Sequence, residues 1–235
     1  NGEGLQHEDG HSQIWASAVP NCISYDPTFA FELAVVIQNG MRRMLTDQED
    51  VYYYITLMNE NYSHPAMPKG AEQDIIKGMY RLQSMGEANN PLRVQLLGSG
   101  TIFREVIAAA EMLHTEWGIA SDLWGCPSMN ELGRDWNETN RSNLLNPGNT
   151  PKLSHVERLL KDTKGPVIAA TDYMRMFAEQ IRPPIQNLGR RYEVLGTDGF
   201  GRSDTREQLR HFFEVDRRWI TVAALKALAD DGKID

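Results

Sequence analysis

Hydrophobic and polar positions follow two different periods along the first part of the chain. Residues 20–25 form a short apolar stretch that predicts a strand, and residues 28–45 carry apolar side chains at helical spacing. The run VYYYITLM at 51–58 is rich in β-branched and aromatic residues and almost wholly apolar. That composition predicts a central strand covered on both faces. The three segments together form a predicted βαβ unit.

The clearest interruption of this pattern is the segment 59–70, which is polar and contains two prolines. Such composition is typical of a linker between domains, because few buried contacts can cross it. We therefore expect a domain boundary near Pro68, with one domain in residues 1–67 and a second in residues 68–235.

Beyond this boundary, predicted strands alternate with predicted helices. The strands are expected at 93–98, 119–126, 166–171 and 192–196, and the helices at 72–83, 102–117, 173–181, 205–213 and 216–229, with a polar and partly helical segment at 130–146. Asp204 is the expected N-cap of the helix at 205–213. This alternation predicts an α/β fold with a mainly parallel sheet.

Composition and charge exclude several classes of protein. The chain has 235 residues, of which 41% are hydrophobic and 24% charged, as in folded globular domains. Its net charge of −8 argues against nucleic acid, whose phosphates attract clustered Lys and Arg. No apolar run approaches the ~18 residues of a membrane span.

Two features bear on the origin of the chain and its compartment. The sequence has neither an initiator Met nor a signal peptide, so we expect it to be part of something longer. Cys22 and Cys126 lie far apart in apolar segments, which indicates two buried thiols in a reducing compartment. We therefore expect the protein to be cytoplasmic.

The densest group of titratable side chains is His7-Glu8-Asp9-Gly10-His11, which matches the H-E-x-x-H pattern of zinc hydrolases. That zinc site needs a helix, and the surrounding glycines oppose one, since glycine costs ~1 kcal/mol against alanine in a helix. Two other interpretations stay open. The segment is either a solvated loop or a functional loop whose imidazoles and carboxylates exchange protons near neutral pH.

Two glycine-rich motifs lie between predicted strands and helices. Gly98-Ser99-Gly100 could hold an anion on backbone amides, but a tight strand-to-helix turn is the favoured interpretation. The run at 196–204, GTDGFGRSD, could bind phosphate through Arg202. We favour the alternative, in which this loop docks one domain on another with Phe200 as a plug.

Five segments taken together resemble one known family. They are NGEGLQHEDGHS at 1–12, PNCISYDP at 20–27, VYYYITLMNENY at 51–62, VQLLGSG at 94–100 and GTDGFGRSDTREQLRHFFEVD at 196–216. Their order and spacing are similar to those of the homodimeric bacterial pyruvate dehydrogenase, decarboxylating component. The resemblance extends over nearly the whole chain.

This resemblance implies a transketolase-like plan and a set of cofactors and partners. Residues 1–67 would be the second half of the aminopyrimidine-binding middle domain, and residues 68–235 the transketolase C-terminal-like domain. The full enzyme would use thiamine diphosphate and Mg, decarboxylate pyruvate and pass the acetyl group to the lipoyl domain of dihydrolipoyl acetyltransferase. The chain would pair with a second copy of itself.

The resemblance also implies which residues act. His7 matches the family's histidine that faces the substrate-derived part of the cofactor adduct, so His7 is the expected catalytic residue. Glu8, Asp9 and His11 are expected to support it. The diphosphate ligands, the metal ligands and the activating glutamate of the family would lie upstream of Asn1. No cofactor or metal ligand is therefore expected in this segment, and the chain alone should bind no cofactor and be inactive.

Rival hypotheses remain open. The chain could be a non-catalytic module for dimerisation and docking, or a zinc hydrolase that uses the HEDGH segment at 7–11. It could also be part of another transketolase-like enzyme that acts on a different 2-oxo acid.

Overall fold

The structure is a computed structural model that describes residues 5–235. Before the linker lie η1 Leu5–His7, α1 Ser12–Ser17, β1 Cys22–Tyr25, α2 Ala30–Met41, the π-helix η2 Arg42–Thr46 and β2 Tyr52–Ile55. After it lie α3 Glu72–Ile76, β3 Tyr80–Met85, β4 Arg93–Gly98, α4 Ile102–Trp117, β5 Ala120–Gly125, α5 Met129–Leu145, α6 His155–Leu160, β6 Val167–Ala170, α7 Met176–Glu179, α8 Arg182–Asn187, β7 Tyr192–Leu195, α9 Arg206–Phe212 and α10 Arg217–Asp230.

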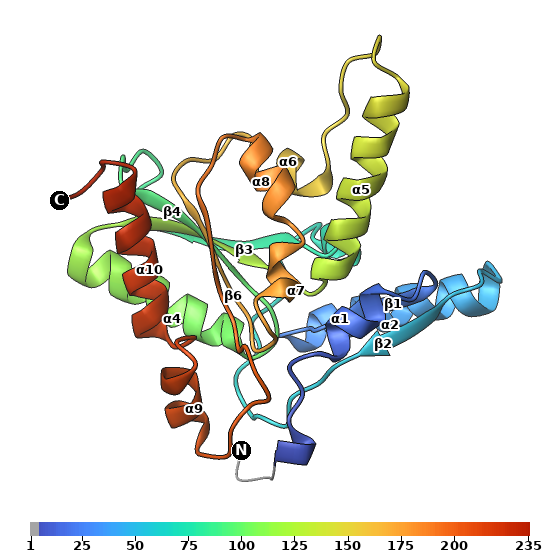
Figure 1. Cartoon of the computed structure of the whole chain (residues 1–235), viewed down its shortest axis with the longest axis horizontal. Coiled ribbons are helices and arrows are strands. Elements are labelled where there is room, and N and C mark those ends of the chain that lie inside the picture. Colours follow the sequence, from blue (N-terminus) through green and yellow to red (C-terminus); the bar gives the residue numbers. More distant parts are fainter. Residues whose placement is uncertain (1–4) are drawn as a thin grey trace.

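The second part of the chain folds around a five-stranded sheet in the order β3-β5-β4-β6-β7. Strands β5, β4, β6 and β7 are parallel, and β3 pairs antiparallel with β5. Helices α4 and α10 cover one face of the sheet, and α5 to α8 cover the other (Figure 1). The predicted α/β class with a mainly parallel sheet is confirmed.

The apolar runs of these strands are explained by burial on both faces. Leu96 packs into the cluster under α4 and α10, and its neighbour Leu97 packs into the cluster under α5 to α8. Both side chains are fully buried. Because successive side chains of a strand point to opposite faces, a strand with helices on both sides buries every position, as β4 does.

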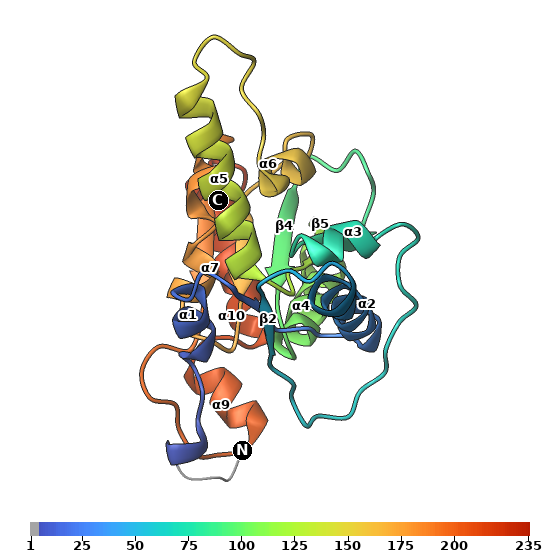
Figure 2. The ribbon, with the colours of Figure 1, turned by 90° about the vertical axis from the view of Figure 1, so that its right-hand side faces the viewer.

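The first part of the chain is built differently, around the two parallel strands β1 and β2. The prediction of a central strand covered on both faces at 51–58 is wrong, because among residues 5–235 β2 pairs with β1 alone and its burial alternates. Tyr52 is 46% exposed and Tyr54 is 36% exposed. Figures 1 and 2 show α1, α2, β1 and β2 projecting from the body that surrounds the larger sheet.

The predicted helix at 72–83 is also wrong in its second half. The helix α3 ends at Ile76, and Gly78 follows with a φ of 99°. A Cβ at Gly78 would lie 2.4 Å from the backbone oxygen of Ser128, so the chain passes too close to its neighbour for any side chain. The following residues form the strand β3, whose first residue, Tyr80, is fully buried.

The two parts meet where β1 ends against the carboxyl edge of the larger sheet. The amide of Asp26 donates to the carbonyl oxygen of Pro127 at 2.7 Å, and the amide of Gly100 donates to the carbonyl oxygen of Asp26 at 3.0 Å. The hydroxyl of Ser128 donates to the carbonyl oxygen of Ser24 at 2.6 Å. These bonds fix the end of β1 beside the loops that follow β4 and β5.

Candidate functional site

A cavity of about 470 Å³ opens at this junction. It is lined by residues 7–10, the end of β2, the turn between β4 and α4, the loops after β6 and β7, and α9. The chain runs from β4 to β5 on one side and returns to β6 on the other, so β4 and β6 flank the point where strand order reverses. Ligands of open α/β sheets bind at this place, outside the carboxyl ends of the strands.

The segment 7–11 is a loop and not a helix. His7 ends η1, and His11 is the residue that precedes α1. The side chain of Asp9 accepts hydrogen bonds from the amides of His11 at 3.1 Å and Ser12 at 2.9 Å, and so ties the loop to the start of α1. The two imidazoles therefore do not lie one helical turn apart, and the zinc-hydrolase geometry is contradicted.

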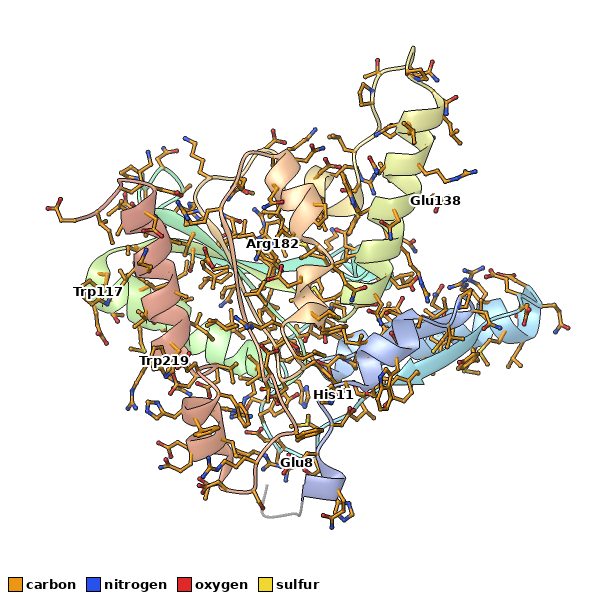
Figure 3. The ribbon with its side chains drawn as sticks, viewed as in Figure 1. Glu8, His11, Trp117, Glu138, Arg182 and Trp219 are labelled. Carbon is orange, nitrogen blue, oxygen red and sulfur yellow. The ribbon has the colours of Figure 1, made fainter. Side chains whose placement is uncertain are left out.

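The structure divides the predicted site residues into two groups. His7, Glu8 and Asp9 line the cavity, whereas His11 faces Trp15, with ring centroids 6.4 Å apart, and does not line it. Figure 3 shows Glu8 and His11 on the segment that leads into α1. Among residues 5–235, the buried Oε1 atom of Glu8 has no hydrogen-bond partner.

Asp26 is a buried carboxyl in the cavity wall that the sequence analysis did not identify. It is 4% exposed, and burial raises its pKa to about 7, although hydrogen bonding from the hydroxyls of Thr56 and Ser99 opposes this rise. The Thr56 hydroxyl donates to Oδ1 at 2.9 Å. Among the described residues Oδ2 has no hydrogen-bond partner, and it lies against Gly100, so one oxygen of this buried acid is unsatisfied.

A second carboxyl, that of the partly buried Asp172, lies on the loop after β6. Burial raises the pKa of Asp172, although the positive charge of Arg210 and the hydroxyl of Thr101, 3.3 Å away, oppose this. The only sequence signal for both acids was their place directly after a strand end. The partners that bury them come from distant segments, so their burial could not be predicted.

An ion-pair network holds the segment after β2 against α4 and α9. Glu60 lies 2.5 Å from Arg104, 2.7 Å from Arg210 and 3.7 Å from Arg206. Burial alone would raise the pKa of Glu60, but the hydrogen bond and charge of Arg210, together with Arg104, hold it below its usual range. Glu60 therefore stays ionised and fixes one wall of the cavity.

The glycine motifs both reach the cavity. Gly100 adopts a φ of 51°, and a Cβ there would lie 2.5 Å from Oδ2 of Asp26, so 98–100 forms a tight strand-to-helix turn. In the 196–204 loop, Gly201 packs on Glu8. The prediction that Phe200 is a plug is wrong, because its ring is 86% exposed. A plug would have to be buried in a pocket, whereas the side chain of Phe200 points to solvent. The glycines on either side of it, Gly199 and Gly201, line the cavity.

Three other expectations concern metal, membrane and thiols. Residues 5–235 contain no group of three or more His, Cys, Asp or Glu that could hold a metal ion. No helix within that range is long and apolar enough to cross a membrane. Cys22 and Cys126 are free and buried, as predicted.

Comparisons with known families divide the chain into two matches. The family described as the pyruvate dehydrogenase E1 component middle domain matches residues 1–65. The family described as the transketolase-like C-terminal domain matches residues 78–216.

Similar proteins are found over the whole chain. A pyruvate dehydrogenase E1 component of Cupriavidus necator is 68% identical over 234 residues, and those of Pseudomonas aeruginosa and Escherichia coli K12 are 59% and 52% identical over 235 and 236 residues. Each match covers 100% of this chain and 26% of the relative. The chain therefore spans about a quarter of the length of these relatives.

Solved structures show the same fold at low identity. A transketolase mutant from Pichia stipitis superimposes with a TM-score of 0.65 at 15% identity, covering 99% of this chain and 29% of that one. A split-gene transketolase, described as an inactive beta4 tetramer, gives 0.62 at 16% identity and covers 96% and 64%.

Proposed function

Since the chain belongs to the transketolase-like C-terminal domain family and is similar over its whole length to bacterial pyruvate dehydrogenase E1 components, we propose that it forms part of such a decarboxylating component. The enzyme would use thiamine diphosphate and Mg to decarboxylate pyruvate oxidatively. The acetyl group would pass to the lipoyl domain of dihydrolipoyl acetyltransferase.

One observation carries this proposal at the level of the site. The loop with His7, Glu8 and Asp9 lines a cavity at the carboxyl edge of a parallel sheet and forms no zinc-binding helix. Imidazole is the side chain that ordinarily gains and loses a proton near neutral pH. An exposed imidazole at the cavity suits proton transfer to and from an oxygen of a bound substrate.

The neighbouring side chains have distinct roles in this proposal. Asp9 accepts hydrogen bonds from the amides of His11 and Ser12 and so fixes the loop that carries His7. Glu8 and Asp26 each present a buried oxygen without a partner among residues 5–235, which can accept a hydrogen bond from substrate or water. His11 would act only through the start of α1, which it precedes.

The described residues do not fit the charged end of thiamine diphosphate. Holding a diphosphate with Mg requires clustered oxygen ligands, and residues 5–235 offer no group that could hold a metal ion. When bound elsewhere in the full enzyme, the cofactor would act as the electron sink for decarboxylation. This chain would supply the substrate-facing wall, and alone it would neither bind the cofactor nor turn over pyruvate.

The arrangement within the full enzyme is part of the same proposal. Residues 1–67 would be the second half of the middle domain and residues 68–235 the C-terminal domain, with a second copy of the subunit completing a homodimer. The separate matches at 1–65 and 78–216 support this division. Two free, buried thiols support a reducing compartment, for which we propose the cytoplasm.

The test is a pair of histidine variants in a subunit that contains this chain together with a cofactor-binding half. We expect His7→Ala to lower kcat by roughly 10²-fold to 10⁴-fold, the usual contribution of a positioned proton donor. His11→Ala is the matched control and should change kcat by less than about threefold, because His11 does not line the cavity. Equal losses in the two variants would contradict the assignment of His7.

A second candidate function, a dimerisation and docking module, is favoured by the exposed apolar side chains of the first part. Trp15, Met41, Leu45 and Leu57 are all more than half exposed. Large exposed apolar surface marks protein interaction sites. Sedimentation of the chain distinguishes a stable dimer from a monomer. The docking module would be favoured if the chain is a dimer and His7→Ala leaves the activity of the assembled enzyme unchanged.

A further inference from the structure

One wall of the cavity carries three arginines from α9 and the loop before it. Arg202, Arg206 and Arg210 all line the cavity, and we call them the arginine wall. They are spaced by four residues, and four residues on a helix bring side chains to the same face, as for Arg206 and Arg210. The His7 loop lines the same cavity, and its Glu8 contacts Gly201, which is next to Arg202.

Arg206 has a donor that the described chain leaves unused. Its Nη2 atom donates to Oδ1 of Asn59 at 2.8 Å, which fixes the guanidinium. Its Nε atom is buried and has no hydrogen-bond partner in residues 5–235, because Oε2 of Glu60 is 3.7 Å away. An unpaired buried donor is costly, so this N–H calls for an acceptor from water or a ligand.

The wall also has a surplus of positive charge. Among the ion pairs of residues 5–235, four arginines beside it, Arg104, Arg206, Arg210 and Arg217, share two carboxylates, Glu60 and Glu105. The carboxyl of Asp172 adds one negative charge near Arg206 and Arg210. Arg202 adds a further positive charge, and its guanidinium lies 4.4 Å above the ring of Phe212. Glu8 and Asp172 also line the cavity and offset part of this charge, although neither forms an ion pair with the three wall arginines among residues 5–235.

We propose that the arginine wall is an oxyanion-binding subsite that takes the carboxylate of the small 2-oxo acid substrate. That the ligand is a 2-oxo acid rests on the proposed function. That the subsite binds an oxyanion rests only on the positive charge of the arginines and on the unpaired Nε–H of Arg206. Guanidinium groups present several N–H donors in one plane and match the two oxygens of a carboxylate.

The loss of charge on decarboxylation assigns the subsite to the arrival of substrate and not to the bond-breaking step. A carboxylate that leaves as carbon dioxide loses its charge, so an ion pair formed during that step would stabilise the ground state more than the transition state. The arginine wall instead raises the local concentration of the anion beside the His7 loop. Its contribution therefore belongs to substrate affinity.

The experiment is a calorimetric titration of this chain with sodium pyruvate and, separately, with inorganic phosphate at matched ionic strength. We expect saturable pyruvate binding with a Kd on the order of millimolar, the range for one charge-assisted contact. Arg206→Gln should weaken binding by at least about fivefold, and Arg202→Gln by about twofold to fivefold. Arg202 is exposed, so its substitution leaves the fold intact even if Arg206→Gln does not.

The matched control is Arg141→Gln, which removes the same charge from an exposed position on α5 that does not line the cavity. It should leave the Kd of pyruvate unchanged. The proposal is overturned if pyruvate does not bind saturably, if only phosphate binds, or if the wall variants bind as well as Arg141→Gln does. None of these results touches the role of His7, whose test is kcat in the assembled enzyme, so the two proposals fail separately.

Discussion

The two parts of the chain use similar strands in opposite settings. β6 lies between parallel neighbours with helices on both faces, and all of its residues are buried. β2 is equally apolar in sequence, yet it has one partner strand and alternating burial. The comparison shows that an apolar sequence permits a strand to be buried on both faces. Whether the strand is buried depends on the segments that pack against it.

The largest expected loss of stability comes from a core substitution in the second part, where strands are buried on both faces. Phe103 is fully buried in the cluster beneath α4 and α10. Phe103→Ala should lower the free energy of unfolding by about 3–5 kcal/mol, because it removes buried area and leaves a cavity. Urea denaturation followed by circular dichroism measures this value, and a loss below about 1 kcal/mol would show that the cluster repacks freely.

The next effect concerns the junction between the parts, through Asp26. Its folded-state pKa of about 7 lies above the ordinary value of 3.8, so the folded chain binds the proton more tightly than the unfolded chain. Stability should therefore fall as pH rises from 4 to 7, by a few kcal/mol in all. Asp26→Asn, which cannot ionise, should reduce this fall and raise the free energy of unfolding at pH 8. The remaining fall comes from Glu32, because burial also raises the pKa of Glu32 to about 7.

The control for this pH series is Asp198→Asn, since Asp198 is an exposed partner of Arg175. It should keep the wild-type fall between pH 4 and 7. If Asp26→Asn shows the same slope as the wild type, Asp26 is not the group that titrates.

A smaller effect tests how the first part is held to β3. The hydroxyl of Tyr80 donates to Oε1 of Glu32 at 2.5 Å, and both side chains are buried. Tyr80→Phe leaves that carboxyl oxygen without this donor and should cost about 1–3 kcal/mol in thermal or urea unfolding. Tyr54→Phe, at a half-exposed site on β2, should cost less than about 0.5 kcal/mol.

The smallest effect lies on the exposed side of the first part. Leu45 is 64% exposed, so Leu45→Gln should change the free energy of unfolding by no more than about 0.5 kcal/mol. The same variant should reduce self-association in sedimentation, because it interrupts exposed apolar surface. A loss of stability as large as that of Phe103→Ala would contradict the difference in burial between the two parts of the chain.

Local signals made much of the fold predictable from the sequence. The helix expected at 102–117 has those bounds, since its apolar periodicity is strong and Gly118 ends it in the left-handed conformation, with a φ of 63°. The strands after residue 90 were found because each is a short, largely apolar segment that alternates with a helical one. Asp204 was one residue early, as Thr205 is the N-cap of α9.

What could not be predicted depends on contacts between distant segments. The strand β3 was missed because its pairing with β5 overrides a helical pattern in residues 80–83. For the site, the sequence identified the His7 loop by its density of titratable groups and by family resemblance. Asp26 and the bond between Arg206 and Asn59 were missed, since burial and pairing arise only when both parts of the chain meet.

The contacts of the His7 loop also set the order in which the cavity can form. The carbonyl oxygen of Gly10 accepts a hydrogen bond from the amide of Met174, and Glu8 rests on Gly201. During synthesis these partners leave the ribosome long after the loop itself, and contacts so distant along the chain form slowly. The loop should therefore reach its place last, when α7 and the strand β7 are already in position.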